Sequence, residues 1–197
     1  AVEFSGKASG KAYIASAFNK PSASARLQID DFRFEDGRMG TLYADSRWNE
    51  KEGQIDIDAI AKDTVLNRMG ERYVPLETSI QGYVSPRKNN IELNIKANGT
   101  RIEFLKSFCG SFIDRVDAFA DGNVQVAGPL DKINLTGELI ANGSLHLSAL
   151  NTSYTLKHAK VRAIPNEIRF LNDTIYDRDG HQGIISGALY HQHLTKM

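Results

Sequence analysis

Residues 122–147 alternate between apolar and polar side chains with a period of two, and this pattern constrains the fold more than any other part of the chain. Such alternation is typical of β-strands that bury one face only. A turn is predicted at Pro129–Lys132, and a second at Asn142–Gly143, because two-residue hairpin turns favour Asn-Gly. The stretch is therefore predicted to form three short strands. The apolar residues that the period places on one face are Val124, Val126, Leu135, Leu139, Leu145 and Leu147.

The same alternating sequence pattern occurs elsewhere in the chain, which predicts a repetitive all-β protein. One copy lies within about residues 5–60, the second within about 118–194, and a weaker one at 80–99 with its own Asn98-Gly99. We interpret residues 1–197 as a single repetitive β segment, taken from a longer protein because it opens in the middle of the pattern.

Two further positions carry local predictions. Glu50-Lys51-Glu52-Gly53 separates two alternating stretches and is predicted to be a hairpin loop. Pro75 lies in an extended stretch and lacks a backbone N–H, so a strand there is predicted to be at a sheet edge or bulged.

Residues 101–119 break the alternation. Their apolar side chains recur at intervals of three and four, which predicts that these residues are helical in whole or in part and that the apolar stripe packs on the sheet. Thr100 and Glu103 match a capping box at its start. A helix lying on a membrane surface would show the same stripe, which is made of Ile102, Leu105, Phe108, Phe112 and Val116. Cys109 falls beside this stripe and is predicted to be a packing residue without a redox role.

The composition excludes several classes of protein. The chain has 24 basic and 24 acidic residues in mixed order, so no basic stripe indicates nucleic acid. Its single cysteine excludes an internal disulfide. No apolar run is long enough to form a membrane-spanning helix.

Few residues suggest a catalytic or metal-binding site. Asp177-x-Asp179-Gly180 resembles part of a calcium loop but lacks the other ligands, so a turn is predicted. His191 and His193 share a strand face without an identifiable third ligand. The carboxylate pairs Asp30-Asp31 and Asp56/Asp58 suit turns and solvated faces. No catalytic residue, metal site or cofactor is predicted, and the chain is not expected to be an enzyme.

What remains is the apolar face. Folded inward, it forms either a dry sandwich core or a groove that holds an apolar ligand, and the alternation is the same in both cases. The six residues named above are the candidate groove-lining residues.

The order of motifs after residue 80 resembles the C-terminal region of the TamB family, inner-membrane-anchored subunits of the translocation and assembly module within the AsmA-like group. The motifs that carry the resemblance are Gly122-x-Val-x-Val-x-Gly-Pro-Leu130, Ile133-Asn-Leu-Thr-Gly-Glu-Leu139, Leu150-Asn-Thr-x-Tyr154, Ile168-Arg-Phe170, Tyr176-Asp-Arg-Asp-Gly180 and Gly187-Ala-Leu-Tyr-His-x-His-Leu194.

The resemblance implies an elongated, folded-over antiparallel sheet, a β-taco, whose hydrophobic inside forms a groove across the periplasm. It implies an outer-membrane barrel protein (TamA or an equivalent) as partner and phospholipid acyl chains as cargo, in transport between the inner and outer membranes. Assistance to nascent outer-membrane β-barrel proteins through their strands is the alternative. An extracellular carbohydrate-binding β protein is a third hypothesis, although Trp48 is the only tryptophan that could serve as a sugar platform.

Overall fold

The computed structural model describes residues 3–17, 20–66, 73–109 and 112–190. They form a single eleven-stranded sheet with one α-helix and one 3-10 turn. The strands are β1 (Phe4–Ala17), β2 (Lys20–Phe34), β3 (Gly37–Asn49), β4 (Gln54–Leu66), β5 (Tyr73–Ser85), β6 (Asn90–Arg101), β7 (Ile113–Pro129), β8 (Asn134–Leu147), β9 (Thr152–Ile164), β10 (Glu167–Tyr176) and β11 (Gln182–Tyr190). The helix is α1 (Leu105–Cys109), and the 3-10 turn is η1 (Ser148–Leu150).

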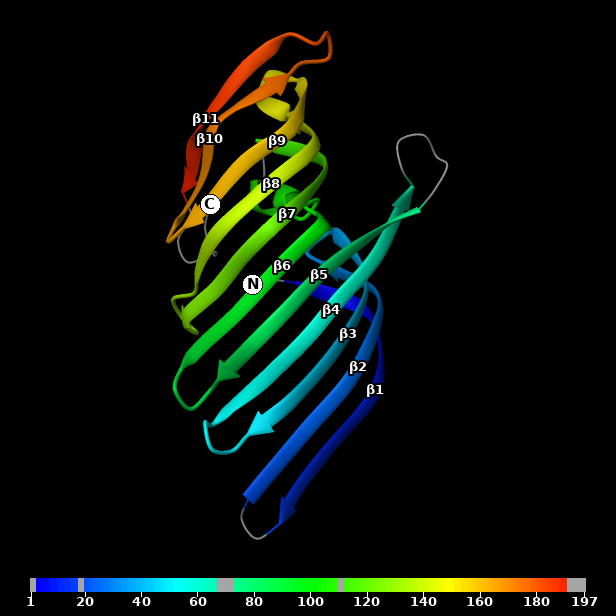
Figure 1. Ribbon diagram of the computed structural model, residues 1–197, viewed down its shortest axis with the longest axis vertical. Helices are drawn as coiled ribbons and strands as arrows, with labels where there is room; N and C mark the ends of the chain where they lie inside the picture. Colours follow the sequence, from blue (N-terminus) through cyan, green and yellow to red (C-terminus); the bar gives the residue numbers. More distant parts are fainter. Residues whose placement is uncertain (1–2, 18–19, 67–72, 110–111, 191–197) are drawn as a thin grey trace.

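The sheet is an antiparallel meander in which every strand pairs with its neighbours in the sequence, from β1 at one edge to β11 at the other. Figure 1 shows the strands stacked like rungs along the long axis of the molecule. The prediction of an elongated, all-β antiparallel sheet is confirmed.

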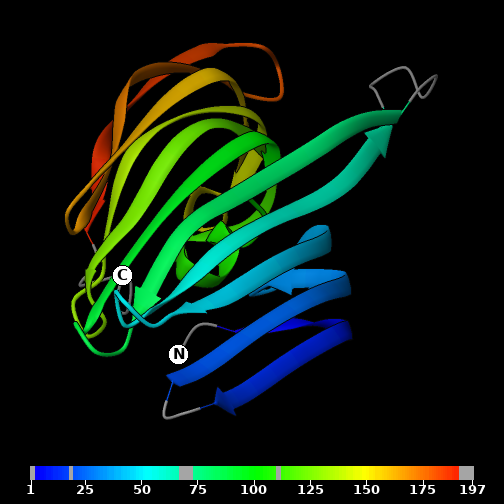
Figure 2. The same cartoon turned by 60° about the horizontal axis from the view of Figure 1, so that its bottom comes forward.

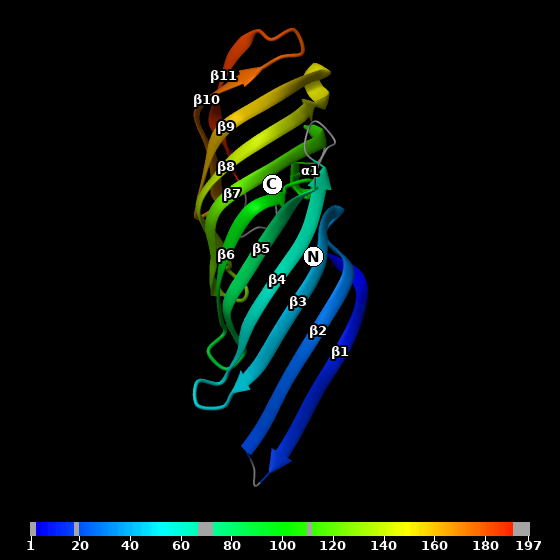
Figure 3. The same ribbon diagram turned by 45° about the vertical axis from the view of Figure 1, so that its right-hand side comes forward.

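The sheet is curved, and its apolar face lies on the inside of the curve. Figure 2 shows β6 to β9 curling around α1, while β1 to β3 are flatter. A larger cluster of buried residues lies on β7, β8 and β9, and a smaller one on β2, β3 and β4. Short hairpin loops join the strands at the end away from α1 (Figure 3).

The Asn142–Gly143 turn prediction is wrong, because both residues lie inside β8 and residues 122–147 form two long strands instead of three. Gly143 pairs with Ala118 of β7. The Asn142 side chain accepts a hydrogen bond at 2.8 Å from the backbone N–H of His158, where β9 bulges with φ 57°. Asn142 thus satisfies the backbone of a bulge in the next strand, a role for which asparagine is equally suited.

The weaker Asn98-Gly99 copy behaves in the same way. It lies within β6 at a register shift against β7, and Gly99 has φ 65°. The Gly99 N–H donates a hydrogen bond to the Asp121 carboxylate at 2.7 Å. By contrast, the turn at Pro129–Lys132 and the loop at residues 50–53 are confirmed. Pro75 pairs with β4, and the pairing of β5 with β6 begins only at Glu77, so Pro75 lies where β5 extends beyond its other neighbour.

The predicted helix over residues 101–119 is wrong for most of its length. Only Leu105–Cys109 is helical, and β7 begins at Ile113. In residues 113–121 the buried positions Ile113, Ala118 and Ala120 occur among charged residues, and pairing with β8 satisfies the backbone. The intervals of three and four arose because Val116 and Phe119 lie on opposite faces of β7. The side chains of Phe108 and Cys109 lie outside the described part of the structure.

Phe112 does not belong to the core that the helical stripe predicted, since its side chain is 47% exposed, whereas Ile113 is 7% exposed. We therefore expect Phe112→Ala to lower the free energy of unfolding by about 1 kcal/mol or less, and Ile113→Ala by at least twice as much. Urea denaturation of the two variants checks this difference. Equal losses would place Phe112 in the core.

Within the described residues, no helix has the length and apolar character that crossing a membrane requires.

Candidate functional site

The candidate site is the apolar face of the sheet, and its most regular part consists of two cross-strand rows. In each row, residues of successive strands lie directly opposite one another, so all members share a face. The first apolar row is Gly10, Leu27, Ala44, Ala59, Ile80, Ile95, Val124, Gly137, Ala163 and Ile168. The second apolar row is Ala8, Ile29, Leu42, Ala61, Thr78, Ala97, Gly122, Leu139, Val161, Phe170 and Gly187.

The two rows form a continuous apolar surface along the sheet. The second row takes one residue from each of the eleven strands. At the usual spacing of about 4.8 Å between strands, that row is about 48 Å long. Thr78 is its one polar member, and its hydroxyl is bonded to that of Thr100 at 2.6 Å.

Most of this face is half-buried, although its residues are apolar. Leu27, Ile80, Ile95 and Val124 all have intermediate exposure. The described residues form a single sheet, so no second sheet packs on this face as it would in a sandwich.

The structure places all six candidate groove-lining residues on this face. Val124 belongs to the first row and Leu139 to the second. Val126 and Leu135 lie opposite each other, one step nearer the hairpin loops. Leu145 and Leu147 lie at the other end of β8, where they are 8% and 9% exposed and belong to the larger buried cluster.

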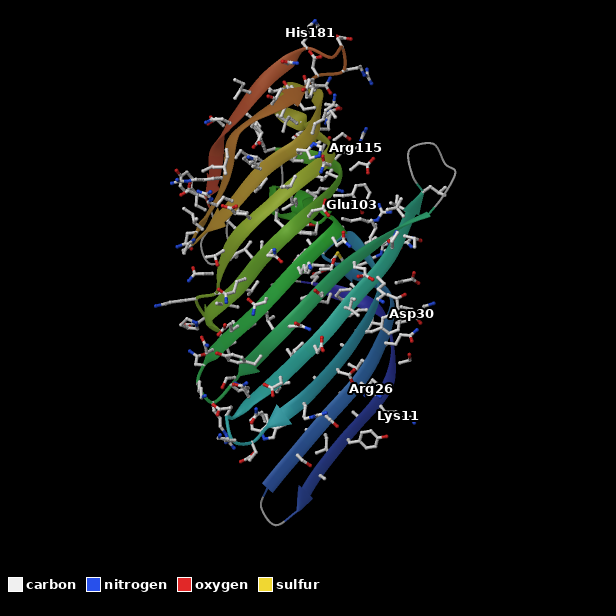
Figure 4. All side chains as sticks on the ribbon, in the orientation of Figure 1. Lys11, Arg26, Asp30, Glu103, Arg115 and His181 are labelled. Carbon is white, nitrogen blue, oxygen red and sulfur yellow. The ribbon has the colours of Figure 1, made fainter. Side chains whose placement is uncertain are left out.

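The opposite face is polar, as the alternation requires. A matching row there consists of Ser9, Gln28, Tyr43, Ile60, Ser79, Lys96, Asn123, Glu138, Arg162 and Arg169. Exposed ion pairs cross between its strands, such as Arg26 with Asp45 at 2.8 Å. Lys11 and Arg26, which are paired neighbours on β1 and β2, lie side by side in Figure 4.

The connection between β6 and β7 covers one part of the apolar face. Residues 102–107, which we call the cover segment, run from Ile102 through the first turn of α1. Ile102, Phe104 and Leu105 pack on the cluster formed by β7, β8 and β9. The Phe104 ring also meets the edge of the Phe34 ring from β2, at 5.1 Å between centroids. The cover segment therefore contacts both the curled and the flatter parts of the sheet.

A buried ionic cluster lies beside the cover segment, and sequence reasoning missed it. Asp63 of β4 has a side chain only 7% exposed and accepts two hydrogen bonds from Arg38 of β3, at 2.9 and 3.0 Å. Arg101 of β6, 17% exposed, lies 3.4 Å from the same carboxylate and 3.3 Å from Glu103. The available signal in the sequence was an aspartate at a position of β4 where the alternation predicts an apolar residue.

The residues considered for metal binding or catalysis lie away from the apolar face. The ligand atoms of Asp177, Asp179 and His181 come within 4.8 Å of one another in the β10–β11 turn. Figure 4 shows His181 at the end of the molecule, away from Glu103 of the cover segment. Asp177 accepts hydrogen bonds from the backbone of Asp179 and His181 and contacts the His181 ring at 2.9 Å. The pKa of Asp177 is lowered, mainly by the hydrogen bond with His181. These contacts are those of a turn.

The two carboxylate pairs are also on the polar side. Asp30 accepts a hydrogen bond from Gln28, and Asp31 lies at a bulge of β2 with φ 51°. The Asp56 carboxylate accepts hydrogen bonds from the side chains of Asn49 and Gln54 at 3.1 and 2.6 Å. His191 and His193 lie outside the described residues.

A scan against models of protein families, a search of curated proteins and a search of solved structures each found no match for this chain.

Proposed function

We propose that this chain is a periplasmic segment of a TamB-like protein and that its apolar face carries phospholipid acyl chains between the inner and outer membranes. The parent protein is anchored in the inner membrane and acts with an outer-membrane barrel protein, TamA or an equivalent. The chain holds its cargo without catalysis, metal or cofactor.

The observation that carries this proposal is the pair of apolar rows. They cross the sheet from β1 to β10 and from β1 to β11, and a polar outer face backs them. Most members of the first row are half-exposed, whereas the second row is buried at Leu42, Ala61, Thr78 and Ala97. An acyl chain laid along them is stabilised by about 25 cal/mol for each Å² of apolar surface removed from water. This interaction needs no directional contact, so a chain can slide from one strand to the next without breaking specific bonds.

The proposal is tested by placing one charge on the apolar face. Val126 lies opposite Leu93 and Leu135 and belongs to neither buried cluster. In Val126→Asp, we expect crosslinking from a phospholipid with a diazirine in its acyl chain to fall at least tenfold at β6 and β8, because covering a carboxylate with hydrocarbon costs several kcal/mol. Mass spectrometry of the labelled peptides measures the loss.

The matched control is Asn123→Asp, which adds the same charge to the same strand on the exposed polar face. It should crosslink like the wild type. Circular dichroism establishes that both variants are folded, and Leu135→Gln replaces Val126→Asp if the latter unfolds. Undiminished crosslinking in a folded variant, or a wild type that never crosslinks on this face, contradicts the proposal.

Strand templating for outer-membrane proteins is the second candidate, supported by the edge strand β11. Its residues 182–190 include no charged side chain, and Ile184 and Tyr190 are 74% and 73% exposed. Natural edge strands usually carry charges that prevent pairing, so this edge suits strand addition. Templating requires no lipid on the rows, and the absence of acyl crosslinking from the wild type would favour it.

Carbohydrate binding is not proposed, because the Trp48 side chain already contacts Arg87 and Glu50. The Arg87 guanidinium lies 5.2 Å from the ring centroid, and the indole N–H donates a hydrogen bond to Glu50 at 2.6 Å.

A further inference from the structure

A patch of very small residues interrupts the larger apolar side chains of the inner face. Ala120, Ala141 and Ala159 lie opposite one another on β7, β8 and β9, and Ala118 lies opposite Gly143. We call these five residues the alanine patch. Its alanines are at most 3% exposed, whereas the Ile, Val and Leu side chains of the neighbouring rows are half-exposed, except for Leu42 at 9%. Residues this small leave a depression unless something fills it.

The cover segment fills that depression from the chain's own sequence. Ile102 is 8% exposed and belongs to the same cluster as the alanines, and Phe104 and Leu105 pack against it. Figure 2 shows α1 within the curl of the strands that carry the patch. The patch therefore has an occupant, and that occupant is a set of aliphatic and aromatic side chains.

Apolar and aromatic contacts, together with a few polar ones, hold the cover segment in place. The Ile102 N–H donates a hydrogen bond to the Ala118 carbonyl at 3.0 Å, Glu103 lies 3.3 Å from Arg101, and the backbone N–H groups of Leu105, Lys106 and Ser107 bond to residues three positions earlier. Lys106 and Ser107 are exposed. Apolar burial thus supplies most of the attachment, which is the same interaction that an acyl chain would make.

The alanine patch is continuous with the second apolar row, since Leu139 of that row packs against the cluster that contains the patch. An acyl chain that follows this row therefore reaches, at Leu139, the cluster to which Ile102 of the cover segment belongs. Two apolar occupants then compete for one surface.

We infer that the alanine patch is an acyl-chain subsite masked by the cover segment, which acyl chains displace as they pass. This inference rests on the proposed function. In the masked state the cover segment keeps the alanine patch dry and separates it from the half-exposed part of the apolar rows. In the displaced state an acyl chain can pass over β7, β8 and β9 without interruption.

The experiment locks the cover segment onto the sheet. A Cβ built at Gly37 of β3 lies 3.0 Å from the Phe104 Cβ and 2.8 Å from the Phe104 backbone nitrogen, so the backbone at Phe104 must move slightly away from β3. A shift of about half an ångström brings the two Cβ atoms into the usual disulfide range of about 3.5–4.5 Å. The variant is Gly37→Cys/Phe104→Cys in a Cys109→Ser background. It is treated with the diazirine phospholipid in vesicles, once oxidised and once reduced.

Crosslinking is then read at two places in the same molecule. Peptides from the alanine patch report the masked subsite, and peptides with Ile57 and Leu93 report the open part of the face. We expect oxidation to lower crosslinking at the patch at least fivefold and to leave the open part unchanged. A single variant, Leu105→Ser, should raise crosslinking at the patch severalfold, while the exposed Ser107→Ala leaves it unchanged.

The outcomes separate this inference from the proposed function. If the open part is labelled but the patch is not, even in Leu105→Ser, the cover segment is a fixed part of the core and the inference is overturned. The same conclusion follows if oxidation leaves labelling of the patch unchanged. If neither place is labelled in any variant, the proposed function itself fails and this inference with it.

Discussion

Replacing Gly137 with alanine is expected to lower the free energy of unfolding by at least about 3 kcal/mol. Gly137 has φ 139°, and an added Cβ would lie 2.3 Å from the carbonyl oxygen of Asn123 and 2.7 Å from the Cα of Val124. Both atoms are backbone of the central strand β7, so no side chain can rotate away. The expected loss combines about 1–3 kcal/mol for the backbone conformation with the displacement of a paired strand.

Gly187→Ala is the matched control. Gly187 has φ 154°, but no atom lies within 4 Å of its added Cβ. It should lose about 1–2 kcal/mol, the contribution of backbone conformation alone. Urea denaturation followed by circular dichroism measures both variants. Equal losses would mean that the close approach of β7 and β8 contributes nothing, and that only the value of φ requires glycine.

Asp63→Ala is expected to cost about 3 kcal/mol, because it removes a largely buried carboxylate that accepts two hydrogen bonds from Arg38 and lies 3.4 Å from the largely buried Arg101 guanidinium. Removing one member of a buried ion pair typically costs about 3–5 kcal/mol, since the remaining charge stays desolvated. Arg101 retains Glu103 at 3.3 Å, which places the expected value at the lower end of that range.

The neighbouring residue supplies the control for this prediction. Lys62 pairs with Glu77 at 3.6 Å on the polar face, and both side chains are more than 40% exposed. Lys62→Ala should therefore change the free energy of unfolding by less than about 1 kcal/mol. If both variants lose the same amount in urea denaturation, the cluster around Asp63 is better solvated than its burial indicates.

The strands were predictable because one rule governs almost all of them. Ile55, Ile57 and Ala59 alternate with Asp56 and Asp58 in the sequence, and the pairing of β4 with β3 and β5 places the two sets on opposite faces. The period of two depends only on backbone geometry, so it can be read wherever the sequence alternates. The six candidate residues follow the same rule and lie on the apolar face; that they line a groove stays a prediction.

The local exceptions could not be read from the sequence. Asn142-Gly143 has the composition of a turn, but whether it closes a hairpin or serves a bulge depends on the strand opposite. The apolar residues within 113–119 recur at helical intervals, yet pairing with β8 makes this stretch a strand. The cluster of Arg38, Asp63 and Arg101 joins three strands through contacts of long sequence separation, which no local pattern contains.

Because each strand of the meander pairs only with its sequence neighbours, the protein is organised like a one-dimensional stack. In such a stack, stability is approximately a sum of contributions from each hairpin and from each contact between adjacent hairpins. A duplicated hairpin can be inserted without rearranging the remainder, provided that it keeps the alternation. The architecture thus allows its length to change in evolution by gain or loss of whole hairpins, and the internal repeats of this chain are what such a history would leave behind.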